Sequence, residues 1–153
     1  MNSNQTNQTK SSLRILACHP DTGTLRLIRD SINNLLHVDI DTSPSSEYAY
    51  ELAIKRPYSL FMFGINMPNL KGPLLYDLLC MIHSKVHEEE PQYPPVIFIG
   101  DETDSGKNDE LRKDARVKAL IYRPLSIDRI ITAVEQALTL RDEFNDPRIS
   151  KNQ

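Results

Sequence analysis

The sequence predicts a doubly wound α/β fold around a parallel sheet, and two stretches carry this prediction. Leu60 to Phe63 is an unbroken apolar run, too short for a helix and rich in aromatic residues, as expected for a strand buried on both faces. Val96 to Ile99 is a second run of this kind, introduced by Pro94 and Pro95. Only a sheet that helices cover on each side offers such strands a place.

Three further segments have the length and pattern of strands. His37 to Asp41 alternates apolar and polar residues, as a strand at a sheet edge would. Leu13 to Cys18 and Ala119 to Tyr122 are compact apolar runs, and Arg123 and Pro124 close the second. Together with the two buried runs they give five strands.

Apolar residues at helical spacing place a helix after four of the strands, and a short, weakly apolar helix is expected after the run at Val96 to Ile99. Asp21 or Thr22 caps the first helix and Ser126 caps the last. The second helix follows the turn at residues 43–46, the third runs from about Leu74 to His87, and the fourth runs from about Asp109 to Ala115. The residues expected to face inward are Leu25, Ile28, Ile32, Leu35, Leu36, Tyr48, Leu52, Leu75, Leu78, Leu79, Ile82, Ile127, Ile130, Ile131, Val134, Ala137 and Leu138.

Five strands alternating with five helices predict an α/β, flavodoxin-like (βα)5 doubly wound parallel sheet with strand order 2-1-3-4-5. One domain, residues 13–141, accounts for all of these elements. Residues 1–12 are too polar to bury a surface and are expected to form a disordered arm, and residues 142–153 are expected to form a polar tail.

Composition narrows the class of protein. The chain has 153 residues, of which 39% are hydrophobic and 25% charged, as in a soluble globular domain. A formal net charge of -3 with interleaved signs argues against nucleic acid as a partner. No apolar run approaches a membrane span and the polar start does not resemble a signal peptide, so we expect a cytoplasmic protein with no membrane partner.

The stretch after the central strand carries a family resemblance. The strand stops at Gly64, and Met67, Pro68 and Gly72 follow it. This pattern resembles the receiver domains of bacterial two-component response regulators, whose third strand ends in an aspartate followed by x-x-Met-Pro-x-x-x-Gly. The resemblance covers roughly Leu13 to Leu138.

The resemblance implies that every reactive position of a receiver is substituted here. Gly64 stands where the family has its phosphorylated aspartate, and His19 and Pro20 stand where it has the acidic pair that holds Mg²⁺. Glycine has no atom to accept phosphorus, and neither imidazole nor proline supplies the hard oxygen ligands that magnesium prefers. The chain is therefore expected to be a degenerate receiver, or pseudo-receiver, that binds neither metal nor cofactor at this position.

The remaining positions of the family's switch are also changed. Gly100 stands in place of the threonine or serine, and Leu120 in place of the aromatic on the fifth strand. Arg123 stands in place of the lysine, and because a guanidinium stays charged, it is expected to pair with Asp21 or Asp101. The alternative is that Arg123 turns toward solvent.

These substitutions predict a non-enzymatic signalling module that works through protein-protein contacts without phosphorylation. The resemblance implies a histidine kinase, another receiver or an output protein as partner. It also implies a homodimer through the fourth helix, the fifth strand and the fifth helix. Two alternatives stay open: a receiver phosphorylated at a displaced acid such as Asp21 or Asp101, and a sensor whose vacated pocket binds a small molecule.

Several other residues allow a chemical interpretation that the sequence does not favour. Cys18 and His19 could act as a nucleophile and base, but neighbouring residues on a strand point to opposite faces. His19 could sense pH. His83 and His87, at i and i+4, could bind zinc, but a third ligand is missing. The acidic loop of Asp101, Glu102 and Asp104 could hold a loose cation, but a solvated loop is the simpler account. Five basic residues near the fourth helix could suggest a nucleic-acid surface, but they are interleaved with acids; they are Lys107, Arg112, Lys113, Arg116 and Lys118.

Overall fold

The computed structural model describes residues 13–90 and 92–145. The expected arm, residues 1–12, and residues 146–153 of the expected tail lie outside the described residues. Within them the last helix continues to Asn145, four residues beyond the domain end expected at position 141. No described helix has the length and apolar content needed to cross a lipid bilayer.

Five parallel strands form one sheet in the order β2-β1-β3-β4-β5, so the predicted fold class is confirmed. The strands are β1 (Arg14–Cys18), β2 (Asp39–Ser43), β3 (Leu60–Gly64), β4 (Val96–Asp101) and β5 (Val117–Arg123). Every residue of β3 is buried, as the unbroken apolar run predicted. Because all strands are parallel, their carboxyl ends meet at one edge of the sheet, where ligands bind in folds of this class.

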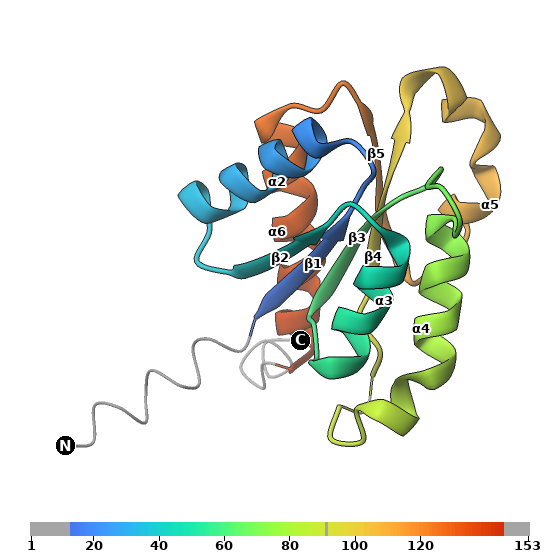
Figure 1. The fold of residues 1–153 in the computed structure, drawn as a ribbon. Helices are drawn as coiled ribbons and strands as arrows, with labels where there is room; N and C mark the ends of the chain where they lie inside the picture. Colours follow the sequence, from blue (N-terminus) through green and yellow to red (C-terminus); the bar gives the residue numbers. More distant parts are fainter. Residues whose placement is uncertain (1–12, 91, 146–153) are drawn as a thin grey trace.

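Helices cover both faces of the sheet (Figure 1). The helices are α2 (Thr22–Leu35), α3 (Ser46–Lys55), α4 (Gly72–Val86), α5 (Asp109–Arg112) and α6 (Ile127–Asn145), with a 3-10 helix, η1 (Glu102–Lys107), before α5. The apolar residues of α2 and α6 pack against one face of the sheet, and those of α3 and α4 pack against the other. The core is therefore split into two layers by the sheet.

The inward faces of α3 and α4 differ from the prediction. In α3, Ala49 and Ala53 are buried, whereas Tyr48 is 50% exposed, because the small alanines allow the helix to approach the sheet closely. In α4, Tyr76 and His83 are buried beside the predicted Leu75 and Leu79, while Leu78 and Ile82 are only partly buried. Both polar rings are tolerated because their polar atoms bond to backbone carbonyl groups, those of Pro94 and Glu90.

Three other expectations about the elements are corrected. Strand β2 is displaced by two residues from the expected His37 to Asp41, because it pairs with β1 from Asp39 to Ser43. Leu35 and Ile127 are exposed because each is the terminal residue of its helix.

The fourth helix is also shorter than the predicted Asp109 to Ala115. It ends at Arg112, and the segment before it, predicted to be a polar loop, forms η1. Only Leu111 of α5 packs against the apolar core, so little apolar surface is available to stabilise a longer helix.

Candidate functional site

The candidate site lies where the chain leaves β1, β3, β4 and β5. His19 follows β1, Gly64 ends β3, Asp101 ends β4 and Arg123 ends β5. Gly64 pairs with Ile99 of β4, and Asp101 pairs with Arg123 across β4 and β5. The residues that the sequence singled out from four different segments therefore meet at one edge of the sheet.

The imidazole of His19 occupies the space above Gly64. A β-carbon added to Gly64 would lie 2.9 Å from Cδ2 of His19 and 3.2 Å from Cγ of Met67. His19 is 4% exposed and Met67 is 6% exposed, so both side chains are held in place by packing. Any side chain at position 64 would have to displace one of them.

The loop between β3 and α4 returns closely to the end of β3. A β-carbon at Gly72 would collide with the carbonyl oxygen of Gly64, so the loop can return this closely only on a glycine. The N–H of Gly72 donates to the carbonyl oxygen of Ile65 at 3.1 Å, and Asn69 has a left-handed φ of 69°. From α3, the hydroxyl of Ser46 donates to the carbonyl oxygen of Leu70 at 2.7 Å.

His19 is held as a neutral ring. The N–H of Asp21 donates to Nδ1 of His19 at 3.0 Å, so the neutral ring carries its proton on Nε2. Burial, and then the nearby charge of Arg123, lowers the pKa of His19 from 6.5 to about 4. His19 is therefore uncharged at neutral pH, and the interpretation that it senses pH near neutrality is wrong.

Arg123 contacts both of the aspartates named from the sequence. Its Nε donates to Oδ1 of Asp101 at 2.7 Å, and its Nη1 lies 3.3 Å from Oδ2 of Asp21. Nη1 also lies 3.3 Å from the hydroxyl of Thr24, which itself donates to Oδ2 of Asp21 at 2.6 Å. Arg123 thus joins the start of α2 to the ends of β4 and β5.

These contacts hold both carboxyl groups in the charged form. Hydrogen bonds from Thr24, the largest cause, and the charge of Arg123 lower the pKa of Asp21, whose carboxylate caps α2. The hydrogen bond from Arg123 lowers the pKa of Asp101. Among the described residues, no three His, Cys, Asp or Glu side chains are grouped so that they could hold a metal ion.

Gly100 is covered by a residue that the sequence analysis missed. A β-carbon at Gly100 would lie 3.0 Å from Cε1 of Tyr122 and 3.1 Å from Cδ1 of Ile65, so the Tyr122 ring lies directly beside this glycine. The hydroxyl of Tyr122 accepts a hydrogen bond from Nη2 of Arg112 in α5 at 3.1 Å. Leu120, two residues before Tyr122, is partly buried against the core and pairs with Phe98.

The alternation of a strand contained a signal for Tyr122. Residues 120 and 122 are two apart, so their side chains leave β5 on the same face. An aromatic residue is therefore present on the face where the sequence comparison found only Leu120. This residue, Tyr122, lies two positions nearer the carboxyl end of β5 than Leu120 does.

The structure gives no support to the other chemical interpretations. Cys18 is fully buried, and burial raises the pKa of its thiol to about 12, so it is no nucleophile. Nε2 of His83 bonds to the carbonyl of Glu90 at 2.8 Å, and Nε2 of His87 bonds to that of Ala53 at 2.6 Å. Since both rings link backbone segments through Nε2, they form a structural contact between α3, α4 and the following loop.

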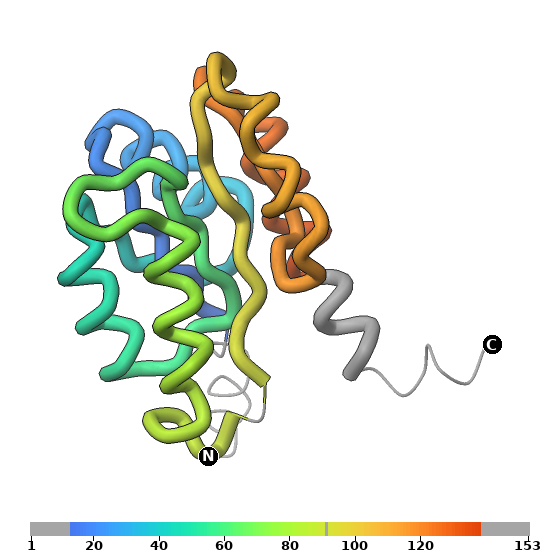
Figure 2. The backbone as a smooth tube through the Cα atoms, turned by 90° about the vertical axis from the view of Figure 1, so that its right-hand side faces the viewer, coloured from blue at the N-terminus to red at the C-terminus, as the bar shows by residue number. Residues whose placement is uncertain are grey.

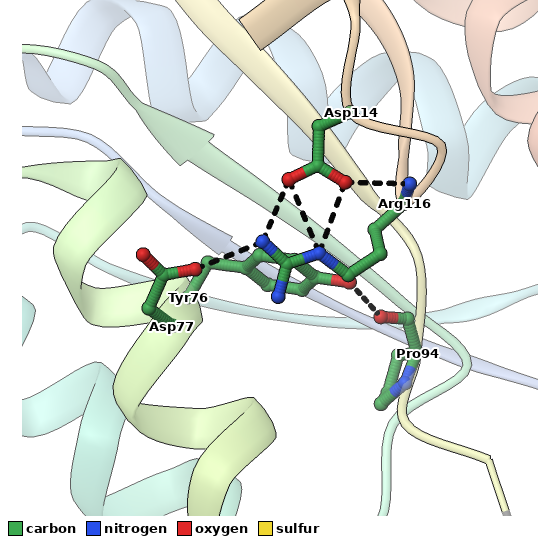
Figure 3. A network of polar contacts seen from close by, with 5 residues as sticks. All are labelled: Tyr76, Asp77, Pro94, Asp114 and Arg116. Atoms are coloured by element: carbon green, nitrogen blue, oxygen red, sulfur yellow. Dashed lines mark hydrogen bonds and ion pairs between the residues drawn. The ribbon is translucent and has the colours of Figure 1, made fainter.

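Two of the five basic residues around α5, Lys107 and Arg116, are paired with acids. Lys107 lies 3.6 Å from Asp104, and Arg116 contacts both Asp114 and Asp77 (Figure 3). Glu102, the third acid of the loop, is exposed, and so are Lys113 and Lys118. This face carries mixed charge and not a continuous basic track.

A groove lies beside Arg123 and away from Gly64. It is open to solvent, has a volume of about 520 Å³ and is lined by Asp21, Gly23, Thr24, Leu27, Asp101, Arg123, Pro124 and Leu125. Neither Gly64 nor His19 lines it. The hollow part of the site is thus separate from the position that ends the central strand.

Comparison with known proteins identifies the fold. No family model matches the chain, and no curated protein matches it in sequence. A sensor protein from Polaromonas sp. JS666 superimposes with a TM-score of 0.68 and 20% identity, over 84% of this chain and 97% of that one. A response regulator receiver domain protein from Clostridium thermocellum gives a TM-score of 0.69 and 15% identity, over 86% and 98%.

A third solved structure has the same fold. A two component transcriptional regulator AraC from Clostridium phytofermentans gives a TM-score of 0.67 and 22% identity, over 88% of this chain and 100% of that one. At these identities the likeness is one of fold, and the chain has the fold of receiver domains over nearly its whole described length.

Proposed function

We propose that this chain is a pseudo-receiver, a non-enzymatic signalling module that acts by binding proteins and takes no phosphoryl group at the end of β3. One observation carries the proposal: the imidazole of His19 fills the space above Gly64, in the place where a phosphoacceptor side chain and its phosphoryl group would have to lie. The fold shared with receiver domains supports a role in two-component signalling.

The surroundings of Gly64 also favour a fixed conformation. Arg123 is bound to Asp101 and Asp21, and the ring of Tyr122 lies against Gly100. A side chain that is already paired or packed has less freedom to respond to a small change at the strand end. We therefore propose that information passes through the shape of the module and through a protein partner, such as a histidine kinase, another receiver or an output protein.

The two alternatives predict different chemistry. Phosphorylation at Asp21 or Asp101 would have to break the contacts of that carboxylate with Arg123, and for Asp21 also the cap of α2. Small-molecule sensing would use the groove beside Arg123, because the space above Gly64 is filled. Among the described residues no buried side-chain nitrogen or oxygen lacks a hydrogen-bond partner, so neither alternative has such a group in its favour.

The test is incubation of the full chain with Mg²⁺ and acetyl phosphate, followed by intact-mass measurement. We expect no adduct. As a positive control, the variant with His19→Asp, Pro20→Asp, Gly64→Asp and Arg123→Lys restores the acids and the lysine, and its labelling shows that donor and fold are competent. A stoichiometric, acid-labile adduct on the unaltered chain would overturn the proposal, and its loss in Asp21→Asn or Asp101→Asn would locate it.

A further inference from the structure

The exposed apolar side chains of the described residues are concentrated on α4. The seven large ones are Leu35, Tyr48, Leu74, Met81, Val86, Tyr93 and Ile127. Three of them belong to α4, one to the neighbouring α3, and a single one to the surface formed by α5, β5 and α6, where the family resemblance placed a homodimer. Among the side chains whose exposure the structure describes, the exposed apolar ones thus lie mainly on a different side of the molecule.

Three apolar residues of α4 form a strip on its outer side. Leu74, Leu78 and Met81 are spaced by four and three residues and lie within about 60° of one another around the helix. Leu74 is 52% exposed, Met81 is 73% exposed, and Leu78 is partly buried between them. Apolar residues with this spacing line the seam between two packed helices in coiled coils.

Helix α3 runs beside α4 on the same face of the sheet (Figure 2). Each helix follows a strand of the parallel sheet and returns toward the amino ends of the strands, so α3 and α4 point the same way. Tyr48, on α3, is 50% exposed and adds an apolar side chain on the neighbouring helix.

Charges on the outer sides of these helices are arranged with acids first and bases last. On α4, Asp77 precedes Met81 by four residues, and Lys85 follows it by four. On α3, Glu47 lies in the first turn and Lys55 in the last. All four are exposed, and within the described part of the chain only Asp77 is engaged in an ion pair, with Arg116.

If two copies of the chain pack through these helices, opposite charges face each other when the helices run antiparallel. If a second copy is related by a two-fold axis across the helices near Met81, the two α4 helices run antiparallel, and Lys85 of each lies level with Asp77 of the other. Glu47 and Lys55 of the α3 helices oppose each other in the same way. A parallel arrangement would oppose like charges. In this arrangement Glu51, midway along α3, lies opposite Glu51 of the second copy. The α3 helices are therefore placed at the solvated rim of the contact, where salt screens the repulsion between these two carboxylates.

We propose that the outer side of α4, flanked by α3, binds a second copy of this chain in an antiparallel two-fold dimer. Four exposed or partly exposed apolar side chains form a small contact, of the size class of weak, transient interfaces below about 1,200 Å². The dimer is therefore concentration-dependent and exchanges rapidly. Its formation does not depend on whether the chain accepts a phosphoryl group.

Sedimentation velocity of the full chain across micromolar to millimolar concentration tests the proposal. We expect a monomer-dimer equilibrium, and Met81→Lys, which places two ammonium groups at the axis, to raise the dissociation constant at least about tenfold. The matched control is Ile127→Lys, on α6 and 48% exposed, which should leave the equilibrium unchanged. A monomer at every concentration, or a dimer lost in Ile127→Lys but kept in Met81→Lys, would overturn it.

A charge exchange tests the antiparallel arrangement. Lys55→Glu places acids opposite Glu47 and should weaken the dimer, more at low than at high salt. Adding Glu47→Lys restores opposite charges and should recover the affinity of the unaltered chain. Both residues are exposed and unpaired in the monomer, so circular dichroism should show the same fold throughout. Failure of the double variant to recover affinity contradicts this arrangement.

Discussion

Two arginines at the two ends of β5 make comparable contacts in different surroundings. Arg116, just before the strand, donates to both carboxylate oxygens of Asp114, with the shortest contact at 2.6 Å, and reaches Asp77 at 3.0 Å. Its guanidinium lies 5.0 Å from the centre of the Tyr76 ring (Figure 3). Tyr76 is buried and donates its hydroxyl proton to Pro94, so Arg116 is joined to the core through the ring.

Arg123, at the other end of β5, also contacts two aspartates, but within the described part of the chain no aromatic ring lies against its guanidinium. Asp101 and Asp21 are more than 40% exposed at the side chain, and Arg123 makes a single contact to each. The comparison shows that the same pairing has two consequences. The pairs of Arg116 cover the buried Tyr76 ring and link α4 to the segment before β5. The pairs of Arg123 lie at the exposed carboxyl end of β5 and neutralise a charge beside the candidate site.

The largest expected effect is on stability at Arg116. Arg116→Ala removes the charged hydrogen bonds and the contact with Tyr76, which link α4 to the turn before β5, and should lower the free energy of unfolding by about 2 to 3 kcal/mol. Arg123→Ala is the control and should lower it by less than about 1 kcal/mol. Urea denaturation measures both. Equal losses of unfolding free energy, or a larger loss for Arg123→Ala, would show that the arginine pairs at the two ends of β5 do not differ in this way.

The second effect is a loss of stability on acidification. The pKa of His19 is lowered to about 4 in the folded chain, so as pH falls the unfolded chain takes up the proton first. Stability that is present above pH 6.5, the ordinary value, is therefore lost as pH falls through the folded pKa. Near pH 4.5 the loss should be about 2 kcal/mol. The check is urea denaturation between pH 7 and 4.5, with His19→Asn expected to flatten this part of the profile.

A third effect concerns the contact between His19 and Gly64. Gly64→Ala places a methyl group against the imidazole and should cost about 1 to 2 kcal/mol of stability. In a His19→Ala background the same substitution should cost less, because the contact with the ring is gone and only the longer contact with Met67, at 3.2 Å, remains. A double-mutant cycle measures the coupling. Additive losses would show that the ring does not occupy this space.

The smallest effect is expected at Arg112. Its contact with the Tyr122 hydroxyl is exposed, so Arg112→Ala should change global stability by less than about 0.5 kcal/mol. Amide hydrogen exchange should nevertheless become faster in η1 and α5, whose apolar contacts are few. Exchange that stays at its original rate in residues 102–112 would show that Tyr122 does not hold this segment.

Much of the fold could be predicted from short apolar runs. Leu60 to Phe63 and Val96 to Ile99 are buried throughout, and the alternation of strands and helices led to the observed strand order. Helix faces were less predictable. Tyr48 and Ala49 are neighbours, and only the distance between α3 and the sheet decides that the alanine is inside.

At the site, the sequence indicated which residues meet but not how they pack. Parallel strands bring Asp101 and Arg123 together whatever their side chains do. That His19 turns over Gly64 follows from the bond between its Nδ1 and the N–H of Asp21, a contact that no sequence spacing specifies. The position of Tyr122 beside Gly100 was available from strand alternation and was overlooked in favour of Leu120.

The most direct test of the filled site is a proton NMR titration of the His19 ring. The chain has four histidines, and His19→Asn assigns the resonance. A buried, neutral ring above Gly64 should titrate at about pH 4 and show Nδ1 unprotonated. A midpoint near the ordinary value of about 6.5 would place the imidazole in solvent and leave the space above Gly64 open, contradicting the account.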